Sequence, residues 1–153
     1  MSYRTNQWKP NVTVAAVVER DGAFLLVEEQ TDDGIRYNQP AGHLEAGESL
    51  IDAVIRETLE ESACDFTPQA LLGVYQYAHP RDGVTYLRFA FTGTLSAPHA
   101  SRALDAGILR ALWMPVDEIR ACSNRHRSPL LMQCVDDYLG GRRHPLQLLH
   151  HHH

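Results

Sequence analysis

Three glutamates are the residues of this sequence best suited to chemistry. Glu57, Glu60 and Glu61 stand at positions i, i+3 and i+4, so on a helix with about 100° per residue they fall within roughly one quadrant. Like charges at these spacings repel by about 0.2–0.5 kcal/mol per close pair, and only Arg56 stands beside them to offset the repulsion. Hard divalent cations such as Mg²⁺ prefer carboxylate oxygens. The cluster therefore predicts a Mg²⁺ site, and the alternative is a solvated charged face.

A helix must hold these glutamates in place, and the sequence indicates where it begins. Ser49 can accept hydrogen bonds from the first free backbone N–H groups, and Asp52 follows three residues later as a capping partner. One side of the expected helix is formed by Ile51, Val54, Ile55, Thr58 and Ser62. The helix is therefore predicted to have an apolar face and a crowded acidic face.

A loop rich in turn-forming residues precedes this helix. Pro40, Gly42 and Gly47 interrupt the chain there, and Glu48 stands at the start of the helix. Such a loop can bring backbone carbonyls and a carboxylate close to a site that bulkier residues would obstruct. This neighbourhood favours the metal site over the solvated face.

The loop and the helix together resemble the signature of the Nudix hydrolases. The match consists of Gly42, Glu48 after five intervening residues, and the run Arg-Glu-Thr-Leu-Glu-Glu at 56–61 after seven more. About seven positions are matched over 23, which is far more specific than a lone glycine motif. The resemblance implies a loop–helix–loop that binds Mg²⁺ or Mn²⁺ and hydrolyses a nucleoside diphosphate linked to another group.

The resemblance extends from about Lys9 to Leu146, and within the Nudix superfamily it is to the NudJ-like phosphatases. It implies an α/β fold of the Nudix type, an α/β/α sandwich with a mixed β-sheet. It also implies removal of terminal phosphate from nucleoside tri- and diphosphates, and action on thiamin-pathway pyrophosphates. The segments that carry this resemblance are 9–29, 37–48, which includes the start of the signature, 87–89 and 127–130.

One position departs from the family pattern. Where the family usually has glycine after the last glutamate and one spacer, this chain has Ala63. Glycine there would suit a left-handed helix C-cap, and alanine in the same conformation would cost about 1 kcal/mol. The departure concerns the exit of the helix and touches no ligand.

The resemblance also implies roles for residues of the signature. The three helix glutamates are the expected metal-binding or water-activating residues, with Glu57 the position most often involved in both. Glu48 and Arg56 are expected to support them by orienting the loop and the glutamate side chains. The Ala41 carbonyl corresponds to a backbone metal ligand. Glu57 is our first choice for the general base and Asp105, in the loop before the last strand, the second; for Asp105 an ordinary loop acid is the alternative.

Basic side chains outside the signature are candidate phosphate contacts. Arg88 lies between two apolar residues of an expected strand, so its guanidinium can point into a cleft and bind phosphate, or outward as a surface arginine. Arg127, near the start of a helix, can contribute to an anion site or remain solvated. His43 and His79 can assist proton transfer, or simply lie on loops.

Residues just before the signature loop are candidate contacts to the rest of the substrate. Tyr37 and Tyr75 can stack on a base or pyrimidine ring, and packing within strands is the alternative. Asn38 and Gln39 can hydrogen-bond the ring edge or the phosphates. These four residues complete the predicted substrate site.

The remaining chain alternates β-type runs with two short helical segments. Residues 12–19 and 24–29 are predicted to form a hairpin around Arg20-Asp21-Gly22, and 35–39 forms a short strand after a second turn. Two long β-type runs form another hairpin, a further strand ends at Pro115, and a short helix precedes a longer one. These segments are 70–79, 84–95, 109–114, 116–121 and 128–138.

Length and composition are those of a single small domain. The 153 residues predict one domain over 1–149, and the histidines at 150–153 are interpreted as the remnant of a purification tag. A net charge of −5 without a basic cluster argues against nucleic-acid binding. Three cysteines without zinc spacing and the lack of a long apolar run favour a cytoplasmic protein without membrane contact. A monomer or a homodimer is expected.

Three functions follow from these features. The first is a Mg²⁺-dependent phosphohydrolase that removes phosphate from nucleoside tri- and diphosphates or small pyrophosphates, with Mn²⁺ as a substitute. The second is a pyrophosphatase for ADP-ribose, a nucleotide-sugar or a dinucleotide. The third is a non-catalytic nucleotide-binding module, against which the intact glutamate cluster argues because a binder does not need so repulsive a cluster.

Overall fold

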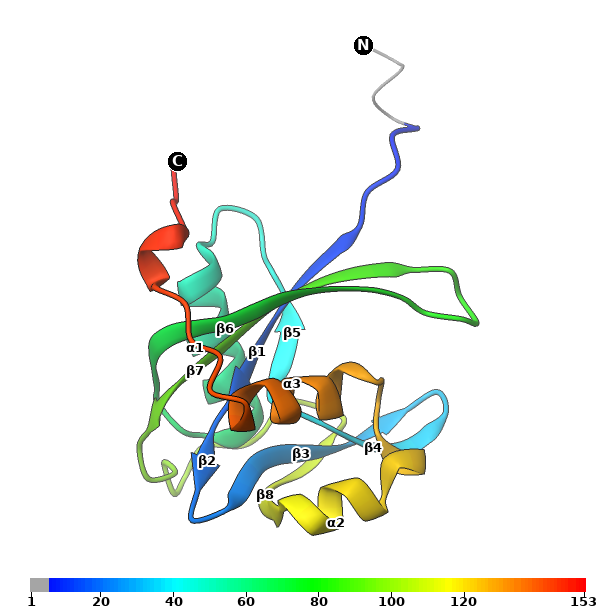
Figure 1. The fold of residues 1–153 in the computed structure, drawn as a ribbon, viewed down its shortest axis with the longest axis vertical. Coiled ribbons are helices and arrows are strands. Elements are labelled where there is room, and N and C mark those ends of the chain that lie inside the picture. Colours follow the sequence, from blue (N-terminus) through cyan, green and yellow to red (C-terminus); the bar gives the residue numbers. More distant parts are fainter. Residues whose placement is uncertain (1–5) are drawn as a thin grey trace.

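Two four-stranded β-sheets form the centre of the molecule (Figure 1). The computed structural model describes residues 6–153, so the first five residues of the predicted domain 1–149 lie outside the described residues. In the first sheet β1 and β7 are parallel and the other neighbours are antiparallel. The strand order of this mixed sheet is β5 (Ala41–His43), β1 (Asn11–Val17), β7 (Thr85–Leu95) and β6 (Phe66–Ala78).

The second sheet is antiparallel and is built around its longest strand, β3. On one side β3 (Ala23–Thr31) pairs with β4 (Gly34–Asn38), and on the other with β8 (Ile108–Pro115). The two-residue strand β2 (Glu19–Arg20) pairs with the beginning of β3. The β3–β4 turn lies at Asp32–Asp33, where the sequence predicts it.

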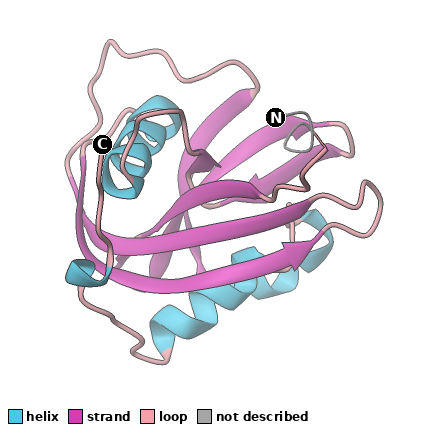
Figure 2. Ribbon diagram, turned by 90° about the horizontal axis from the view of Figure 1, so that it is seen from above, coloured by secondary structure: helices cyan, strands magenta, loops and turns pink. Residues whose placement is uncertain are grey.

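Helices cover both sides of the sheets (Figure 2). The helix α1 (Leu50–Ser62) lies on one side, and α2 (Val116–Ala121) and α3 (Leu130–Leu139) lie on the other. Two 3₁₀ helices, Ser123–Arg125 and Leu146–Leu148, follow α2 and α3. The predicted α/β/α sandwich with a mixed sheet is therefore confirmed. No helix among residues 6–153 combines the length and the apolar character needed to cross a bilayer.

Two apolar clusters, one on each side of the sheets, hold these layers together. Because successive side chains of a strand point to opposite faces, β3 contributes to both: Leu25 packs toward α1, while Phe24 and Leu26 pack toward α2 and α3. The cluster against α1 also includes Val14, Ala16, Ala53, Val54, Phe66 and Phe91. The other includes Val17, Leu72, Ile119, Leu131 and Val135.

One predicted hairpin is wrong. The segment 12–19 does not pair with 24–29 as one strand; β1 ends at Val17 and pairs with β7 and β5 in the first sheet. Only β2 forms a hairpin with β3, through Asp21 and Gly22, which both have positive φ. The apolar run of β1 is buried on both faces, which is typical of a strand in the interior of a sandwich and not of an outer hairpin.

The other predicted elements are confirmed. The antiparallel pair β6 and β7 is the predicted second hairpin, and α2 has the predicted bounds. The helix α1 begins after Ser49, whose hydroxyl accepts a hydrogen bond from the Asp52 amide at 3.0 Å. At its end Ala63 adopts the left-handed conformation, with φ 62° and ψ 19°, and its amide donates to the Leu59 carbonyl.

Candidate active site

The signature loop and α1 meet where Gly42 lies against Glu57. Gly42 belongs to β5, which pairs with β1 at Val14, and a β-carbon at this glycine would overlap the Glu57 carboxylate. The backbone of β5 can therefore approach the helix only because Gly42 has no side chain. This contact positions the first glutamate of the cluster.

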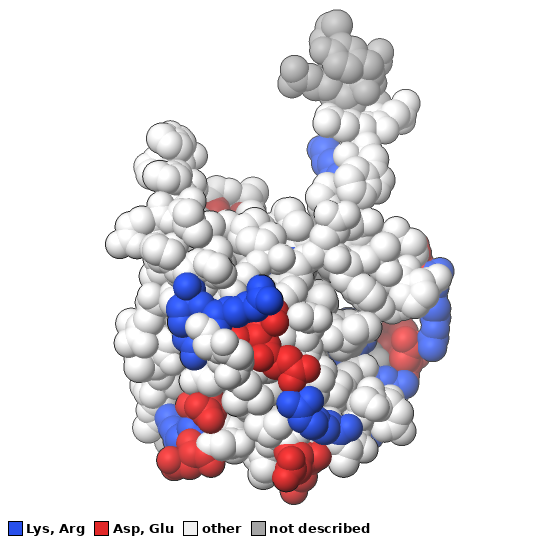
Figure 3. All heavy atoms as spheres, in the orientation of Figure 1, with Lys and Arg blue, Asp and Glu red and all other residues white. Residues whose placement is uncertain are grey.

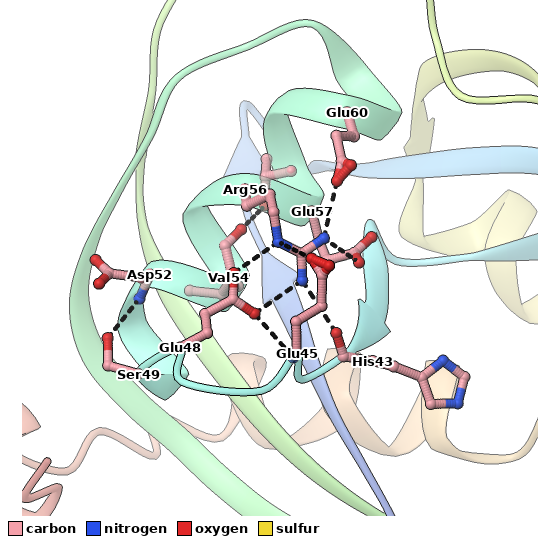
Figure 4. Close-up of polar contacts among 10 residues, drawn as sticks. His43, Glu45, Glu48, Ser49, Asp52, Val54, Arg56, Glu57 and Glu60 are labelled. Carbon is pink, nitrogen blue, oxygen red and sulfur yellow. Dashed lines mark hydrogen bonds and ion pairs between the residues drawn. The ribbon is translucent and has the colours of Figure 1, made fainter. Parts of the chain in front are cut away.

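Arg56 connects the loop to two of the three glutamates (Figure 4). Its guanidinium binds Glu48 through two hydrogen bonds, from Nε at 2.6 Å and from Nη2 at 2.9 Å. Nη1 donates to Glu57 at 2.7 Å and to Glu60 at 2.8 Å, and Nη2 also donates to the His43 carbonyl at 3.0 Å. Arg56 thus orients the acidic side chains, the supporting role that the sequence predicts.

Glu48 is held equally firmly by the loop. Its Oε1 accepts the Glu45 amide at 3.0 Å, and the hydrogen bonds from Arg56 lower the pKa of its carboxyl group. The same contacts, with Glu48 the largest contributor, raise the pKa of Arg56. Glu48 is therefore an ionised anchor for Arg56.

The sequence predicts an acidic face of α1 that is separate from the face packed against the sheet. In the structure two members of that acidic face, Glu57 and Glu61, are themselves buried. Burial raises the pKa of Glu57 in spite of its contact with Arg56. Burial also raises the pKa of Glu61 to about 8, although this carboxylate accepts a hydrogen bond from the Ala41 amide at 3.0 Å. A bound cation would favour the ionised forms of both groups.

Two of the three predicted glutamates lie in a group of carboxylates that could hold a metal ion, and the third member of this group is Asp105. Glu57, Glu60 and Asp105 each offer an oxygen atom, and these oxygens lie within 4.8 Å of one another. Asp105 is brought there because its amide donates to the Glu60 carbonyl at 3.0 Å. Glu61 instead turns toward Ala41. Three carboxylates form a set of hard oxygen donors, which fits a divalent ion such as Mg²⁺.

A cleft of about 710 Å³ begins at this cluster. Glu57 lines the cleft and also belongs to the group with Glu60 and Asp105, so it links the two. The cleft continues between the β3–β4 and β6–β7 hairpins. Among its lining residues are Thr13, Glu29, Asn38, Ala41, Gly42, His43, Arg56, Glu61, Tyr77, His79, Tyr86, Arg88 and Arg127.

Arg88 lines the cleft as a buried cation whose hydrogen-bond partners are all neutral. Its guanidinium donates to the side-chain oxygens of Gln39 at 2.9 Å and Asn38 at 3.0 Å, and lies 3.7 Å from the Cys134 sulfur. No carboxylate among residues 6–153 forms an ion pair with it. Because a buried charge without a counter-ion is costly, this arrangement can stabilise an anionic ligand such as a phosphate.

Gln39 accepts a hydrogen bond from Arg88 and lies outside the cleft. It is 1% exposed, its amide nitrogen donates to the Leu131 carbonyl at 2.9 Å, and it does not line the cleft. The structure thus places Gln39 behind Arg88, and its direct contact with substrate stays a prediction. Asn38 does line the cleft, and its side-chain oxygen accepts a hydrogen bond from Arg88.

The two tyrosines chosen from the sequence lie outside the cleft. Tyr37 is buried, with the Arg125 guanidinium 4.6 Å above its ring. Tyr75 packs against the cluster under α3, and its hydroxyl donates to Asp137 at 2.8 Å. Both side chains lie on the α2–α3 side of the sheets, in the packing positions that the sequence left open as the alternative to stacking.

Arg127 lines the cleft but already has a partner. Its guanidinium pairs with Glu29 at 2.7 Å, and Glu29 lines the cleft as well. Its amide donates to the Tyr37 carbonyl at 2.8 Å, which joins the segment before α3 to β4. An anion would have to compete with Glu29 for this arginine.

Sequence reasoning missed two tyrosines of the β6–β7 hairpin that do line the cleft, Tyr77 and Tyr86. A signal was present, since Tyr86 stands two residues before Arg88 and residues at i and i+2 share a face of a strand. The pairing of the two strands, which sets Tyr77 beside Tyr86, was not readable from sequence.

Comparisons with known proteins agree with this architecture. The family model of the NUDIX domain matches residues 8–134. Phosphatase NudJ from Escherichia coli K12 is 39% identical over 142 residues, which are 93% of this chain and 92% of that protein. The structure of a NUDIX hydrolase from Nitrosomonas europaea is similar with a TM-score of 0.92 and 52% identity, over 94% of this chain and 98% of the other.

A more distant structure shows the same fold. The NUDIX domain of Shewanella oneidensis NrtR, in a complex with ADP ribose, has a TM-score of 0.71 at 18% identity, over 92% of this chain and 96% of the other.

Proposed function

The chain belongs to the Nudix hydrolases, which act on phosphoric anhydride bonds, and we propose that it removes terminal phosphate from nucleoside tri- and diphosphates with the help of Mg²⁺. The observation that carries the proposal is the position of Glu57, which faces both the acidic group and the cleft. The likeness to Phosphatase NudJ over nearly the whole chain supports release of phosphate over internal cleavage. By the same likeness the substrates extend to thiamin-pathway pyrophosphates.

The acidic group supplies the ligands for the ion. Glu57, Glu60 and Asp105 would hold it, with Glu61 and the Ala41 carbonyl as the further ligands expected from the resemblance. When bound, Mg²⁺ or Mn²⁺ would screen the charge of the phosphates and make water a better nucleophile. The positive charge of the ion would also offset the repulsion between a chain of net charge −5 and an anionic substrate.

The chain's own residues then position the phosphates and move a proton. Arg88 donates hydrogen bonds to a phosphate at the middle of the cleft, where Asn38 already orients it. Glu57 accepts the proton of the attacking water, because its carboxylate borders the cleft and burial raises its pKa. Arg56 keeps that carboxylate oriented at 2.7 Å. Burial of Arg88, Glu57 and Glu61 limits their motion and thus the cost of positioning.

The described residues on one face of the molecule form no large basic region (Figure 3). On the face shown in Figure 3, acidic and basic side chains lie beside one another in small groups. This pattern supports a small-molecule substrate over a nucleic acid, whose binding requires many phosphate contacts.

Phosphate release with chromatographic identification of products tests the proposal. The panel consists of nucleoside tri- and diphosphates, ADP-ribose and thiamin-pathway pyrophosphates, each with Mg²⁺ and with chelator. We expect metal-dependent free phosphate that is lost in Glu57→Gln and retained in the control Glu118→Gln, on the exposed side of α2. Phosphate release that persists at the wild-type rate in Glu57→Gln would remove Glu57 from the mechanism.

The same assay distinguishes the two other functions. Nucleoside monophosphate and pyrophosphate as the products of the nucleoside triphosphates, with no free phosphate, would indicate an internal pyrophosphatase. Ligand-dependent thermal stabilisation with no product after long incubation would indicate a binding module. Either result would overturn the phosphatase proposal.

A further inference from the structure

Two tyrosines face each other across the β6–β7 hairpin inside the cleft. Tyr77 and Tyr86 are directly opposite in the antiparallel register, and both line the cleft and are half-buried. Directly opposite side chains of an antiparallel pair stand about 5 Å apart at their β-carbons. Both residues therefore contribute an aromatic ring to one wall of the cleft.

Their hydroxyl groups distinguish these tyrosines from the others among residues 6–153. The hydroxyls of Tyr37, Tyr75 and Tyr138 each have a protein hydrogen-bond partner. Those of Tyr77 and Tyr86 have none among residues 6–153. Because buried or packed tyrosines usually satisfy their hydroxyls within the protein, this pair is available to a ligand.

The strand register places the tyrosines in line with Arg88 and the acidic end of the cleft. Thr13 of β1 pairs with Arg88 on one side and His43 on the other, so about 10 Å separates β7 from β5. Tyr86 stands two residues from Arg88 along β7, a further distance of about 7 Å. A ligand that reaches from the tyrosines to Glu57 therefore passes Arg88 on the way.

The outer end of the cleft is completed by His79 and an ion pair. The His79 ring lies 6.3 Å from that of Tyr77 at an interplanar angle of 76°, and it also lines the cleft. Arg81, in the β6–β7 turn, pairs with Asp33, in the β3–β4 turn. Figure 1 shows these two hairpins reaching out on the same side of the molecule. The pair joins the two walls at the end of the cleft that holds the aromatic rings.

We propose that Tyr77, Tyr86 and His79 form the ring-binding end of the cleft and select substrates in which a planar heteroaromatic ring is joined to a chain of phosphates. This inference rests on the proposed function, and it adds the residues that set its specificity. The ring stacks on the tyrosine pair, Arg88 binds the phosphate chain, and the terminal phosphate reaches the acidic group at Glu57. Aromatic surfaces accept any base because every base has a π-face, so purine and pyrimidine nucleotides both fit.

The test removes the ring contact from the protein and, separately, the ring from the ligand. In Tyr77→Leu and Tyr86→Leu we expect KM for nucleoside triphosphates to rise about tenfold, the effect of one lost stacking contact. The inhibition constant of inorganic tripolyphosphate, which has no ring, should stay within about twofold of wild type. Tyr77→Phe and Tyr86→Phe should keep KM within about threefold, since the ring remains.

Controls separate this inference from the proposed function. Tyr75→Phe, on the same hairpin but outside the cleft, should leave KM unchanged, and thermal melts verify that the leucine variants are folded.

Equal effects on nucleotide and tripolyphosphate, or none on either, would overturn the ring site. If wild-type protein releases no phosphate from nucleotides, the proposed function fails; equilibrium dialysis of a labelled nucleotide with wild type and Tyr86→Leu then decides on the ring site alone. Comparing ATP with CTP shows whether purine and pyrimidine rings are both accepted.

Discussion

A β-carbon on Gly42 would lie 2.1 Å from the carboxyl carbon of Glu57 and 2.3 Å from both of its oxygens. A side chain at position 42 would overlap the Glu57 carboxylate at these distances. The backbone of β5 can therefore lie this close to Glu57 only with glycine at position 42. The relationship ties the loop of the Nudix signature to its first helix glutamate.

The first prediction is that Gly42→Ala reduces turnover by about 100-fold or more, because Glu57 must swing away from the cleft and displacing a catalytic group by about 1 Å has this effect. Steady-state phosphate release measures it. The matched control is Gly22→Ala in the β2–β3 turn, where a β-carbon meets nothing within 4 Å but φ is +82°. That variant should lose stability through backbone strain and retain turnover. Full activity in Gly42→Ala would show that Glu57 need not stay where it is.

The second prediction concerns Asp105, which lies 44 residues beyond Glu61 in the chain but shares a group with Glu57 and Glu60. We expect Asp105→Asn to weaken Mn²⁺ binding by about tenfold or more, because one anionic oxygen of the ligand group is lost. Isothermal titration calorimetry of the folded, metal-free protein measures the affinity. Asp117→Asn, on the exposed side of α2, is the control. Unchanged affinity and turnover would leave Asp105 as an ordinary loop acid.

The third prediction is a pH dependence of stability due to Glu61 in metal-free protein. Its pKa is raised from 4.5 to about 8 in the fold, so between these values the folded chain holds a proton that the unfolded chain has released. The contribution of this proton to the free energy of unfolding is fully present below about pH 4.5. It is lost as the pH rises toward 8, by up to about 1.4 kcal/mol per pH unit. Urea denaturation in chelator across this window should show a smaller slope for Glu61→Gln. An equal slope in both proteins would contradict the burial of an unpaired acid at this position.

The fourth prediction is that Ala63→Gly stabilises the protein. Alanine adopts φ 62° at the end of α1, and glycine relieves a cost of about 1 kcal/mol. Chemical denaturation should show a gain of about 0.5–1 kcal/mol with unchanged turnover. Asp21→Gly, at φ 53°, should gain less, because aspartate tolerates this conformation better. A loss of stability in Ala63→Gly would mean that the buried methyl group contributes more through packing than the backbone strain costs.

Local chemistry in the sequence was enough to identify the helix, its cap and the glutamates. Ser49 and Asp52 mark the start of α1, and the spacing of Glu57, Glu60 and Glu61 follows from the helical repeat alone. The role of Arg56 was also readable, because Glu60 stands four residues along the helix. These features depend on neighbours within one or two turns, and they are present in the structure.

Tertiary structure decided which distant residues share the site. Asp105 joins Glu60 through a hydrogen bond between loops far apart in sequence, and the β6–β7 register sets Tyr77 against Tyr86 while Tyr75 turns to α3. The same holds for β1, which left its expected hairpin for the interior of the first sheet. Strand pairing and burial are settled by packing between whole elements, whereas a helix and its caps are settled by residues a few positions apart. For this protein the sequence by itself therefore determined the acidic helix α1 and its carboxylates. The tertiary structure decided which distant residues, such as Asp105 and the β6–β7 tyrosines, lie near that helix and in the cleft.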